Sequence, residues 1–299
     1  RIWRVRHSGG KMARTFPDFG DANDAELILA LSHPNGWVRD TAQRLLLGRG
    51  GDHAVALATI ASGDNTVAAL HAIWTLHGRG ELQRKLVMKI ARLDDTQRQI
   101  QALRAGRSLL SAADLVTLYE ELSPDSADVL SMQLAFAMGD HASDASVRRA
   151  LVTLLTASLE SPYIRQAVVR AVAGEELLFL REYLGSEHLG AVSEAARTAL
   201  SSLASGAYRS LRGDITSGES ANPALLELLA LAESRSNDNA WQQMAMLEGM
   251  KSVAASTDFV PAVLEASPEI FSDGSISEQD PLWEARMRGR TAFTWPGDE

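Results

Sequence analysis

The chain has 299 residues, of which 45% are hydrophobic and 22% charged, an ordinary composition for a folded protein. It contains no cysteine, which excludes disulfides, zinc ribbons, iron–sulfur clusters, thiol catalysis and covalent haem attachment within these residues. The net charge of −9 disfavours a partner with a phosphate backbone, and no apolar stretch approaches the length of a membrane span.

The first six residues alternate in character, with Ile2 on one side and Trp3 and Val5 on the other. This alternation predicts a short strand. Because a single strand is not stable by itself, we expect it to be the last strand of a preceding β domain. Residues 7–20 contain Gly and Ser and are predicted to be a linker, so residues 1–20 form the end of that β domain and its connection.

From about residue 21 the sequence predicts pairs of helices. The clearest pair surrounds the turn at Pro34-Asn35-Gly36, where Asp24 and Asn35 or Gly36 are the expected N-caps, as Asp64 is in the next pair. The second helix of the pair has one apolar face made of Trp37, Val38, Thr41, Ala42, Leu45 and Leu46. The predicted pairs are 25–32 with 37–48, 52–61 with 65–77, 81–91 with 94–105, 111–121 with 125–138, 144–158 with 162–173, 174–184 with 189–203, and 222–233 with 239–254.

The period of these pairs is about 30 to 45 residues, the range of HEAT-type repeats. Each pair can bury its apolar face only by stacking on its neighbours. The predicted fold is therefore all-α, a HEAT-like α-solenoid of six to seven helical pairs over residues 21–255, interrupted by a Ser- and Gly-rich loop at 204–221.

After residue 255 the helical pattern weakens, and residues 256–299 are predicted to be an extension that leads to a following domain. Its last residues include Phe293 and Trp295. Two aromatic side chains in such a tail are expected to dock, either on the last repeat or on the following domain.

No nucleotide-binding, nucleophile or metal-ligand motif is present, so no catalytic, cofactor-binding or metal-binding residues are predicted. His77 ends a predicted helix, where a protonated imidazole favours the helix dipole. Trp37 and Trp74 are expected to pack in the core between repeats, with a role at an interface as the alternative. Arg39 and Asp40 are expected to belong to a ladder of Asp and Arg between neighbouring repeats. A basic cluster is interpreted as a solvated helix face rather than a nucleic-acid site: it comprises Arg84, Lys85, Lys89, Arg92, Arg98 and Arg104.

Four segments together resemble one family. They are Arg1-Ile2-Trp3-Arg4-Val5, the stretch from His33 to Leu46, Ala72-Ile73-Trp74-Thr75-Leu76-His77, and the stretch from Gly289 to Gly297. They look like the middle region of large planctomycete and verrucomicrobial proteins, the PVC-type haem-binding or membrane-bound dehydrogenase-domain proteins. In that resemblance Ile2, Trp3 and Val5 end a propeller blade, Trp37, Arg39, Ala42, Arg44 and Leu45 match the first repeat, Trp74, Leu76 and His77 match the second, and Gly289, Arg290, Phe293, Trp295 and Gly297 precede the next domain.

The resemblance implies a sorbosone- or glucose-dehydrogenase-like β-propeller upstream, HEAT repeats in the middle and a c-type cytochrome downstream. It also implies a periplasmic location, with haem c, and PQQ as a candidate, in the parent protein, a quinone-dependent sugar or alcohol dehydrogenase. Neither the propeller nor a Cys-x-x-Cys-His motif lies in this chain, so we expect these residues themselves to carry no cofactor and no catalysis.

Three functions stay open at this point. The first is a non-catalytic scaffold that positions the propeller dehydrogenase and the cytochrome for electron transfer. The second is a protein-binding HEAT-repeat module without a redox role, and the third is an enzyme of the phycobilin-lyase type. The expected partners are the propeller and cytochrome domains or another protein, and not nucleic acid. The candidate interface residues are Ile2, Trp3, Val5, Trp37, Arg39, Trp74, His77, Phe293 and Trp295.

Overall fold

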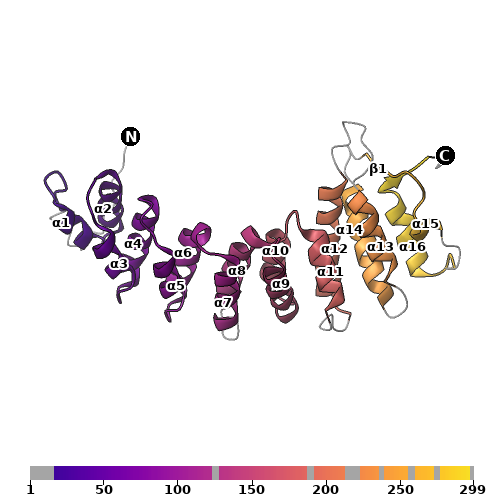
Figure 1. Ribbon diagram of the computed structural model, residues 1–299, viewed down its shortest axis with the longest axis horizontal. Helices are drawn as coiled ribbons and strands as arrows, with labels where there is room; N and C mark the ends of the chain where they lie inside the picture. The colour runs from indigo at the N-terminus through magenta and orange to yellow at the C-terminus, as the bar shows by residue number, and fades with distance from the viewer. Residues whose placement is uncertain are drawn as a thin grey trace, which may run out of the picture. The chain divides into compact units, whose positions relative to one another are not determined.

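The computed structural model describes residues 17–122, 128–186, 192–212, 223–235, 239–254, 260–272 and 277–296. Within these residues the chain forms sixteen α-helices and one two-stranded parallel sheet (Figure 1). This confirms the predicted all-α class. The chain divides into two compact units, unit 1 (Arg1–Leu110) and unit 2 (Ser111–Glu299).

Unit 1 contains three helical pairs. Its elements are α1 (Asp24–Ala30), α2 (Gly36–Gly48), α3 (Ala54–Ala61), α4 (Thr66–Gly78), α5 (Arg84–Ile90), α6 (Thr96–Gly106) and the 3-10 helix η1 (Arg107–Leu109). The second helices α2, α4 and α6 contact one another in succession. The first helices are shorter, with 7, 8 and 7 residues against 13, 13 and 11. A groove lies between the short helices α3 and α5.

Unit 2 continues the same pattern of pairs. Its elements are α7 (Ala112–Leu122), α8 (Asp128–Met138), η3 (Gly139–His141), α9 (Ala145–Ala157), α10 (Pro162–Ala171), α11 (Glu176–Gly185), α12 (Glu194–Leu211), α13 (Pro223–Glu233), α14 (Ala240–Ala254), β1 (Ala262–Val263), α15 (Glu269–Ser272), α16 (Pro281–Arg290) and β2 (Phe293–Thr294). The helices α8, α10, α12, α14 and α16 contact one another in succession, as do α7, α9 and α11.

Side-chain caps set where the helices begin. Asn23 caps α1 in a reciprocal capping box with Glu26, and Asn35 caps α2. The Asn65 side chain accepts the backbone N–H of Ala68 at 3.1 Å and caps α4. The predicted caps Asp24 and Asp64 are therefore each wrong by one residue, because the neighbouring Asn has the extended backbone that a cap requires.

The apolar stripe predicted for α2 is half right. Val38, Ala42 and Leu46 are fully buried, each at 0% exposure, and a fully buried valine or leucine side chain contributes roughly 1.5–3 kcal/mol. Trp37 is instead 60% exposed. It lies in the first turn of α2, on the edge of the stripe.

The loop predicted at 204–221 is wrong over its first eight residues, because α12 runs to Leu211. Ser205 and Gly206 gave this stretch the composition of a loop. Ala204, Ala207 and Tyr208 nevertheless continue the buried helical stripe, with exposures of 0%, 1% and 0%. Burial against α14 therefore outweighs the poor helix propensity of the Ser and Gly residues.

The residues after 255 contain more structure than their pattern predicts. β1 and β2 pair in parallel, with Ala262 opposite Phe293, and α16 packs on α14. Residues 260–272 and 277–296 therefore belong to unit 2. The strand predicted at residues 1–6 lies outside the described residues, as do Ile2, Trp3 and Val5.

Candidate interaction surfaces

Polar side chains connect the second helices of unit 1. Nε of Arg39 on α2 donates to Nε2 of His71 on α4 at 3.1 Å, and Nδ1 of His71 lies 2.7 Å from Oε1 of Gln43. Further along, Nε1 of Trp74 donates to Oε1 of Gln101 on α6 at 3.0 Å. These bonds fix the register of neighbouring helices, so the residues that make them serve the fold first.

The surroundings of His71 determine which of its ring nitrogens carries a hydrogen and keep the imidazole neutral. Because a guanidinium can only donate, Nε2 of His71 is the acceptor and Nδ1 carries the hydrogen that Gln43 accepts. Burial, with the Arg39 charge as the second cause, lowers the pKa of His71 below its usual 6.5. His71 is thus a neutral bridge between two helices, rather than a metal ligand or an acid–base group.

Arginines near helix starts hold the turns that precede them. Nη1 of Arg39 donates to the carbonyl oxygens of His33 and Pro34, at 2.7 and 3.0 Å. Nη1 of Arg148 on α9 makes the same pair of bonds, to Ala142 and Ser143 at 3.1 and 2.6 Å. In α10, Nη1 of Arg165 donates to the Leu159 carbonyl at 2.6 Å. Each arginine is the fourth residue of its helix and reaches back six residues.

This arrangement corrects the predicted Asp–Arg ladder at Arg39. The Arg39 guanidinium binds carbonyl oxygens and a histidine, and Asp40 is exposed. The signal for the true role is the repeated Val-Arg or Ile-Arg pair, at Val38-Arg39, Val147-Arg148 and Ile164-Arg165. The apolar residue is buried and the arginine that follows it caps the turn.

Three of the remaining candidates lie at different depths. Trp74 is half-buried and bonded to Gln101, which agrees with packing between repeats. His77 is exposed in the last turn of α4, with its ring edge-on to Trp74 at 5.3 Å. Trp37 is exposed, so the prediction that it lies in the core is wrong, and its role at an interface stays a prediction.

Phe293 and Trp295 dock within their own unit. Phe293 is 3% exposed and packs against Tyr208, with ring centroids 5.3 Å apart, and against Phe271 at 5.6 Å. Trp295 stacks on Phe271 at 6.1 Å, with the Arg290 guanidinium over its ring. Phe293 is therefore a core residue and not an interface residue, because β2 places it against Tyr208 of α12 and in contact with α16. Trp295 is half-buried and keeps an accessible edge.

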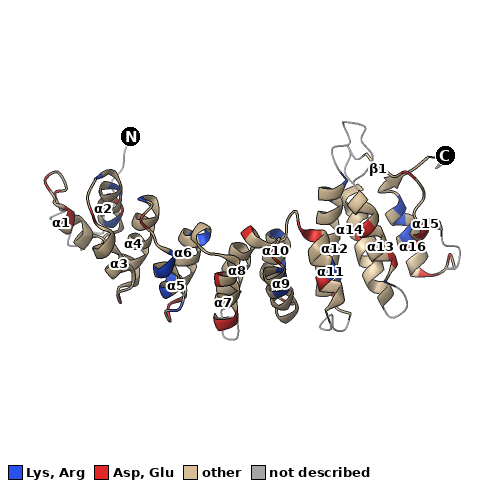
Figure 2. Ribbon diagram, viewed as in Figure 1, with Lys and Arg blue, Asp and Glu red and all other residues tan. Residues whose placement is uncertain are grey.

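The basic cluster of the third pair is largely exposed on α5 and α6 (Figure 2). Arg98 is the exception, because its guanidinium bonds Asp95 at 2.8 Å and the Gly63 carbonyl at 2.6 Å. Asp95 in turn accepts from the Thr66 hydroxyl, which ties the starts of α4 and α6 together. One member of the cluster is thus a structural residue, and the others form a surface.

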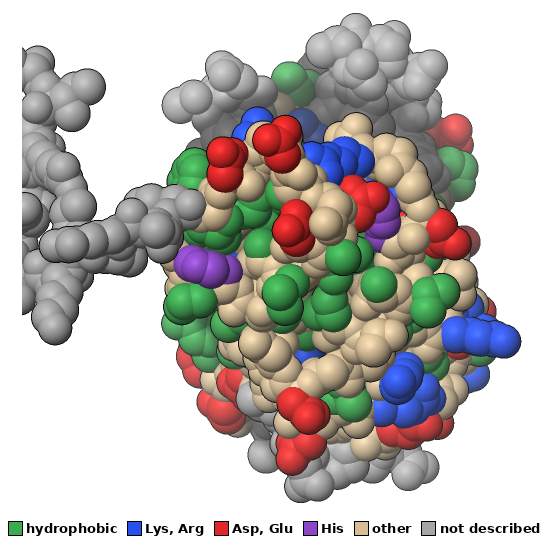
Figure 3. Space-filling view, turned by 90° about the vertical axis from the view of Figure 1, so that its left-hand side faces the viewer, with side chains coloured by type: hydrophobic (Ala, Val, Ile, Leu, Met, Phe, Trp, Pro, Cys, Tyr) green, Lys and Arg blue, Asp and Glu red, His purple; other side chains and the backbone are tan. Residues whose placement is uncertain are grey.

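An apolar hollow of about 640 Å³ lies at the α1 end of unit 1. Figure 3 shows hydrophobic side chains gathered there with acidic side chains around them. Leu29 is 73% exposed in this hollow. The other lining residues are Pro17, Asp18, Phe19, Asp21, Ala22, Glu26, Ala30, Ser32, His33 and Pro34. Leu29 projects from α1 on the side away from Leu27, which is buried against the rest of the pair.

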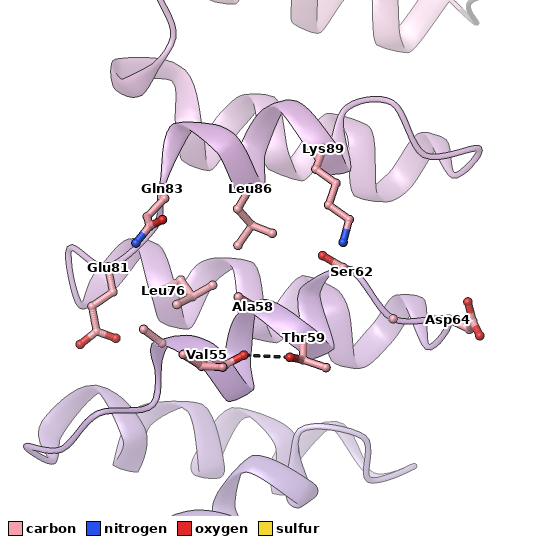
Figure 4. Close-up of a pocket in the computed structure, with 12 residues that line it drawn as sticks. Val55, Ala58, Thr59, Ser62, Asp64, Leu76, Glu81, Gln83, Leu86 and Lys89 are labelled. Atoms are coloured by element: carbon pink, nitrogen blue, oxygen red, sulfur yellow. Dashed lines mark hydrogen bonds between the residues drawn. The ribbon is translucent and has the colours of Figure 1, made fainter.

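A second hollow, of about 720 Å³, is the groove between α3 and α5. Figure 4 shows Leu86 of α5 pointing toward Ala58 of α3, and Val55 of α3 and Leu76 of α4 also line the groove. Val55 is 77% exposed. The charged side chains at the rim are Asp64, Glu81 and Lys89. An apolar floor with a thin charged rim suits a peptide or a helix of another protein better than a small polar substrate.

No group of three or more His, Asp and Glu side chains within the described ranges is arranged to hold a metal ion. Among the helices that the structure describes, none is both long and apolar enough to cross a membrane. No family model matches the sequence, and no curated protein matches it. The fold and its surfaces therefore provide the grounds on which a function can be proposed.

Proposed function

We propose that this chain is a non-catalytic scaffold of HEAT-like helical pairs that binds other protein domains. The supporting observation is the apolar hollow at the α1 end of unit 1. Stacked repeats cover one another's apolar faces, and a terminal repeat exposed to water needs a polar outer face. Leu29, at 73% exposure beside Phe19 and Pro34, is the opposite of such a face. A protein surface that covers this hollow would remove that apolar area from water.

In its more specific form, the proposal gives the scaffold a redox setting. A β-propeller dehydrogenase would lie upstream and a c-type cytochrome downstream, in the periplasm, with the helical pairs fixing the distance between them. The resemblance of the four sequence segments supports this form. Trp37, one of the residues that carry the resemblance, is 60% exposed at the start of α2. Since electron transfer weakens steeply with distance, a rigid spacer would set its rate.

The alternative is a protein-binding module without a redox role. The groove between α3 and α5 supports this form equally well, because Val55 and Leu86 offer an apolar surface whatever lies on either side of the chain. The two forms predict different parent proteins, but they use the same surfaces of unit 1.

The intact mass and visible spectrum of the protein from its native source distinguish these forms. A mass well above 32.3 kDa together with a haem Soret band supports the redox form. A mass that matches this chain, without a chromophore, contradicts the redox form and favours the module.

Hydrogen exchange tests the scaffold itself. We expect the amides of α1 (Asp24–Ala30) to exchange more slowly in the native protein or complex than in the isolated 299-residue chain, because a covering domain protects that end. A Leu29→Asp variant should lose this protection, and a Val55→Asp variant, outside the hollow, should keep it. Equal exchange in both preparations would contradict a covered end.

A further inference from the structure

A third hollow lies in unit 2, between the second helices α10 and α12. It has a volume of about 590 Å³ and lies where the two helices run side by side in the succession of second helices. Its walls include the apolar side chains of Val169, Ala173 and Ala199 and the hydroxyls of Thr198, Ser202 and Ser205. We name it the α10–α12 groove.

Arginines dominate the charge of the α10–α12 groove. Arg165 and Arg170 line it from α10, and Arg209 lines it from α12. Arg165 is half-buried and anchored by its bond to the Leu159 carbonyl, and Nη2 of Arg209 donates to the Ser205 hydroxyl at 2.8 Å. A guanidinium has five N–H donors, so each of these anchored groups keeps further donors for a ligand. Anchoring also reduces the entropy lost when a ligand binds.

The one acidic residue in the lining is already engaged. Glu176 is 5% exposed, and its Oε2 accepts the backbone N–H of Gly174 at 2.9 Å and the Ser210 hydroxyl at 3.4 Å. Gly206 makes room for it, because a methyl group there would lie 2.9 Å from its Oε1. The carboxylate therefore belongs to the wall and not to the open face of the groove.

The charge of this groove contrasts with that of the groove between α3 and α5. Its lining holds three arginines and one buried glutamate, whereas the groove between α3 and α5 holds one lysine and two acidic residues. The whole chain has a net charge of −9. A basic groove in an acidic protein concentrates a positive field where an acidic ligand would lie.

We propose that the α10–α12 groove binds an acidic peptide segment of a partner protein, with carboxylates on Arg165, Arg170 and Arg209. Guanidinium forks pair with carboxylates through two parallel hydrogen bonds. Three forks on two helices engage successive carboxylates, and Val169, Ala173 and Ala199 accept apolar side chains between them. The overall negative charge opposes a nucleic acid, which would extend its phosphates beyond the groove. This proposal rests on the proposed scaffold function, for which it names a class of partner.

Fluorescence polarisation with a fluorescein-labelled peptide of alternating Glu and Ala tests the proposal on the full chain. We expect saturable binding that weakens as salt is added. The double variant Arg170→Glu/Arg209→Glu should bind about tenfold more weakly or worse. Arg197→Glu is the control for the single variant Arg209→Glu, because each reverses one charge on α12 and only Arg209 lines the groove. Circular dichroism checks that each variant keeps its helices.

Three results would overturn the proposal. They are unchanged binding by the double variant, an equal loss in Arg197→Glu and Arg209→Glu, and tighter binding of a single-stranded DNA oligonucleotide than of the peptide. The first two would show a diffuse charge effect, and the third would assign the groove to nucleic acid. Failure of this proposal leaves the protection of α1 unaffected, so it is distinguishable from failure of the scaffold function.

Discussion

Gly249 of α14 lies directly against the Ser201 carbonyl of α12, so that a methyl group at Gly249 would be 2.1 Å from that oxygen. The obstacle is backbone, which no change of rotamer can move aside. We expect Gly249→Ala to lower the free energy of unfolding of unit 2 by about 1–3 kcal/mol or more, measured by urea denaturation. Gly185→Ala is the control, because its new methyl group meets nothing within 4 Å, and its stability should be unchanged or slightly higher.

The neighbours Arg148 and Arg149 allow a test of the arginines that hold turns. Arg148 is 8% exposed and bonds two turn carbonyls and Glu182 at 3.1 Å, whereas Arg149 is exposed. Arg148→Lys loses the planar fork and should cost about 1–3 kcal/mol in thermal or urea unfolding. Arg149→Lys should leave the midpoint unchanged. If both changes have the same effect, the turn bonds contribute nothing to stability.

The bridge through His71 makes the stability of unit 1 depend on pH. Since the folded pKa lies below the unfolded value near 6.5, the unfolded state binds more protons between the two values. The contribution of His71 is therefore fully present above about pH 6.5 and is lost as the pH falls through the folded pKa.

The measurement is the free energy of unfolding at about pH 8 and at about pH 5, in the wild type and in His71→Gln. Glutamine can accept from Arg39 and donate to Gln43 without titrating. We expect a smaller loss of stability at low pH in the variant than in the wild type. An equal loss in both proteins would assign the acid sensitivity to the carboxylates.

Tyr208 joins α12 to the segment before β2. Its hydroxyl donates to the Ala292 carbonyl in a buried hydrogen bond, and burial raises the pKa of Tyr208 to about 12. Tyr208→Phe leaves that carbonyl with one partner fewer and should cost about 0.5–1.5 kcal/mol in urea unfolding. Tyr163→Phe, at a ring that is 69% exposed, should cost nothing measurable. A greater loss at Tyr163 would contradict the assignment.

Mutation of Leu27 should lower the stability of unit 1, whereas mutation of Leu29, on the same helix α1, should not. Leu27 is 0% exposed, and Leu27→Ala should destabilise unit 1 by about 2–5 kcal/mol. Leu29 is 73% exposed, and Leu29→Asp should leave unfolding of the isolated chain unchanged while it removes apolar area from the hollow. A strong loss of stability in Leu29→Asp would show that this side chain is covered by the chain itself.

The sequence was sufficient to predict the helical class and the pairing of helices, because apolar periodicity and Asn or Asp caps are local signals. The prediction that Trp37 is buried is wrong, since the periodicity of α2 puts Trp37 at the edge of the stripe and periodicity does not decide whether an edge is covered. The extension of α12 past Ser205 and Gly206 was missed because tertiary burial of Tyr208 overrides propensity. Phe293 was left with two possible docking partners for the same reason.

The candidate surfaces were even less visible in the sequence. Arg165, Arg170 and Arg209 come together only because α10 and α12 lie side by side, and the three residues are spread over two helical pairs. The repeated apolar-Arg pair was a readable signal for the turn-holding role of Arg39. An expectation based on charge alone favours a carboxylate partner, whereas the Arg39 guanidinium bonds the carbonyl oxygens of the preceding turn.

The bond from Tyr208 to Ala292 has a consequence for the order of folding. The two residues are 84 positions apart, whereas contacts in a stack of helical pairs mostly join nearest neighbours. Contacts at such separation form late, because the intervening chain must first lose its freedom. During synthesis, unit 1 can therefore complete its core before Ala292 is available to Tyr208. Tyr208 of α12 gains this hydrogen bond only after the last part of the chain has left the ribosome.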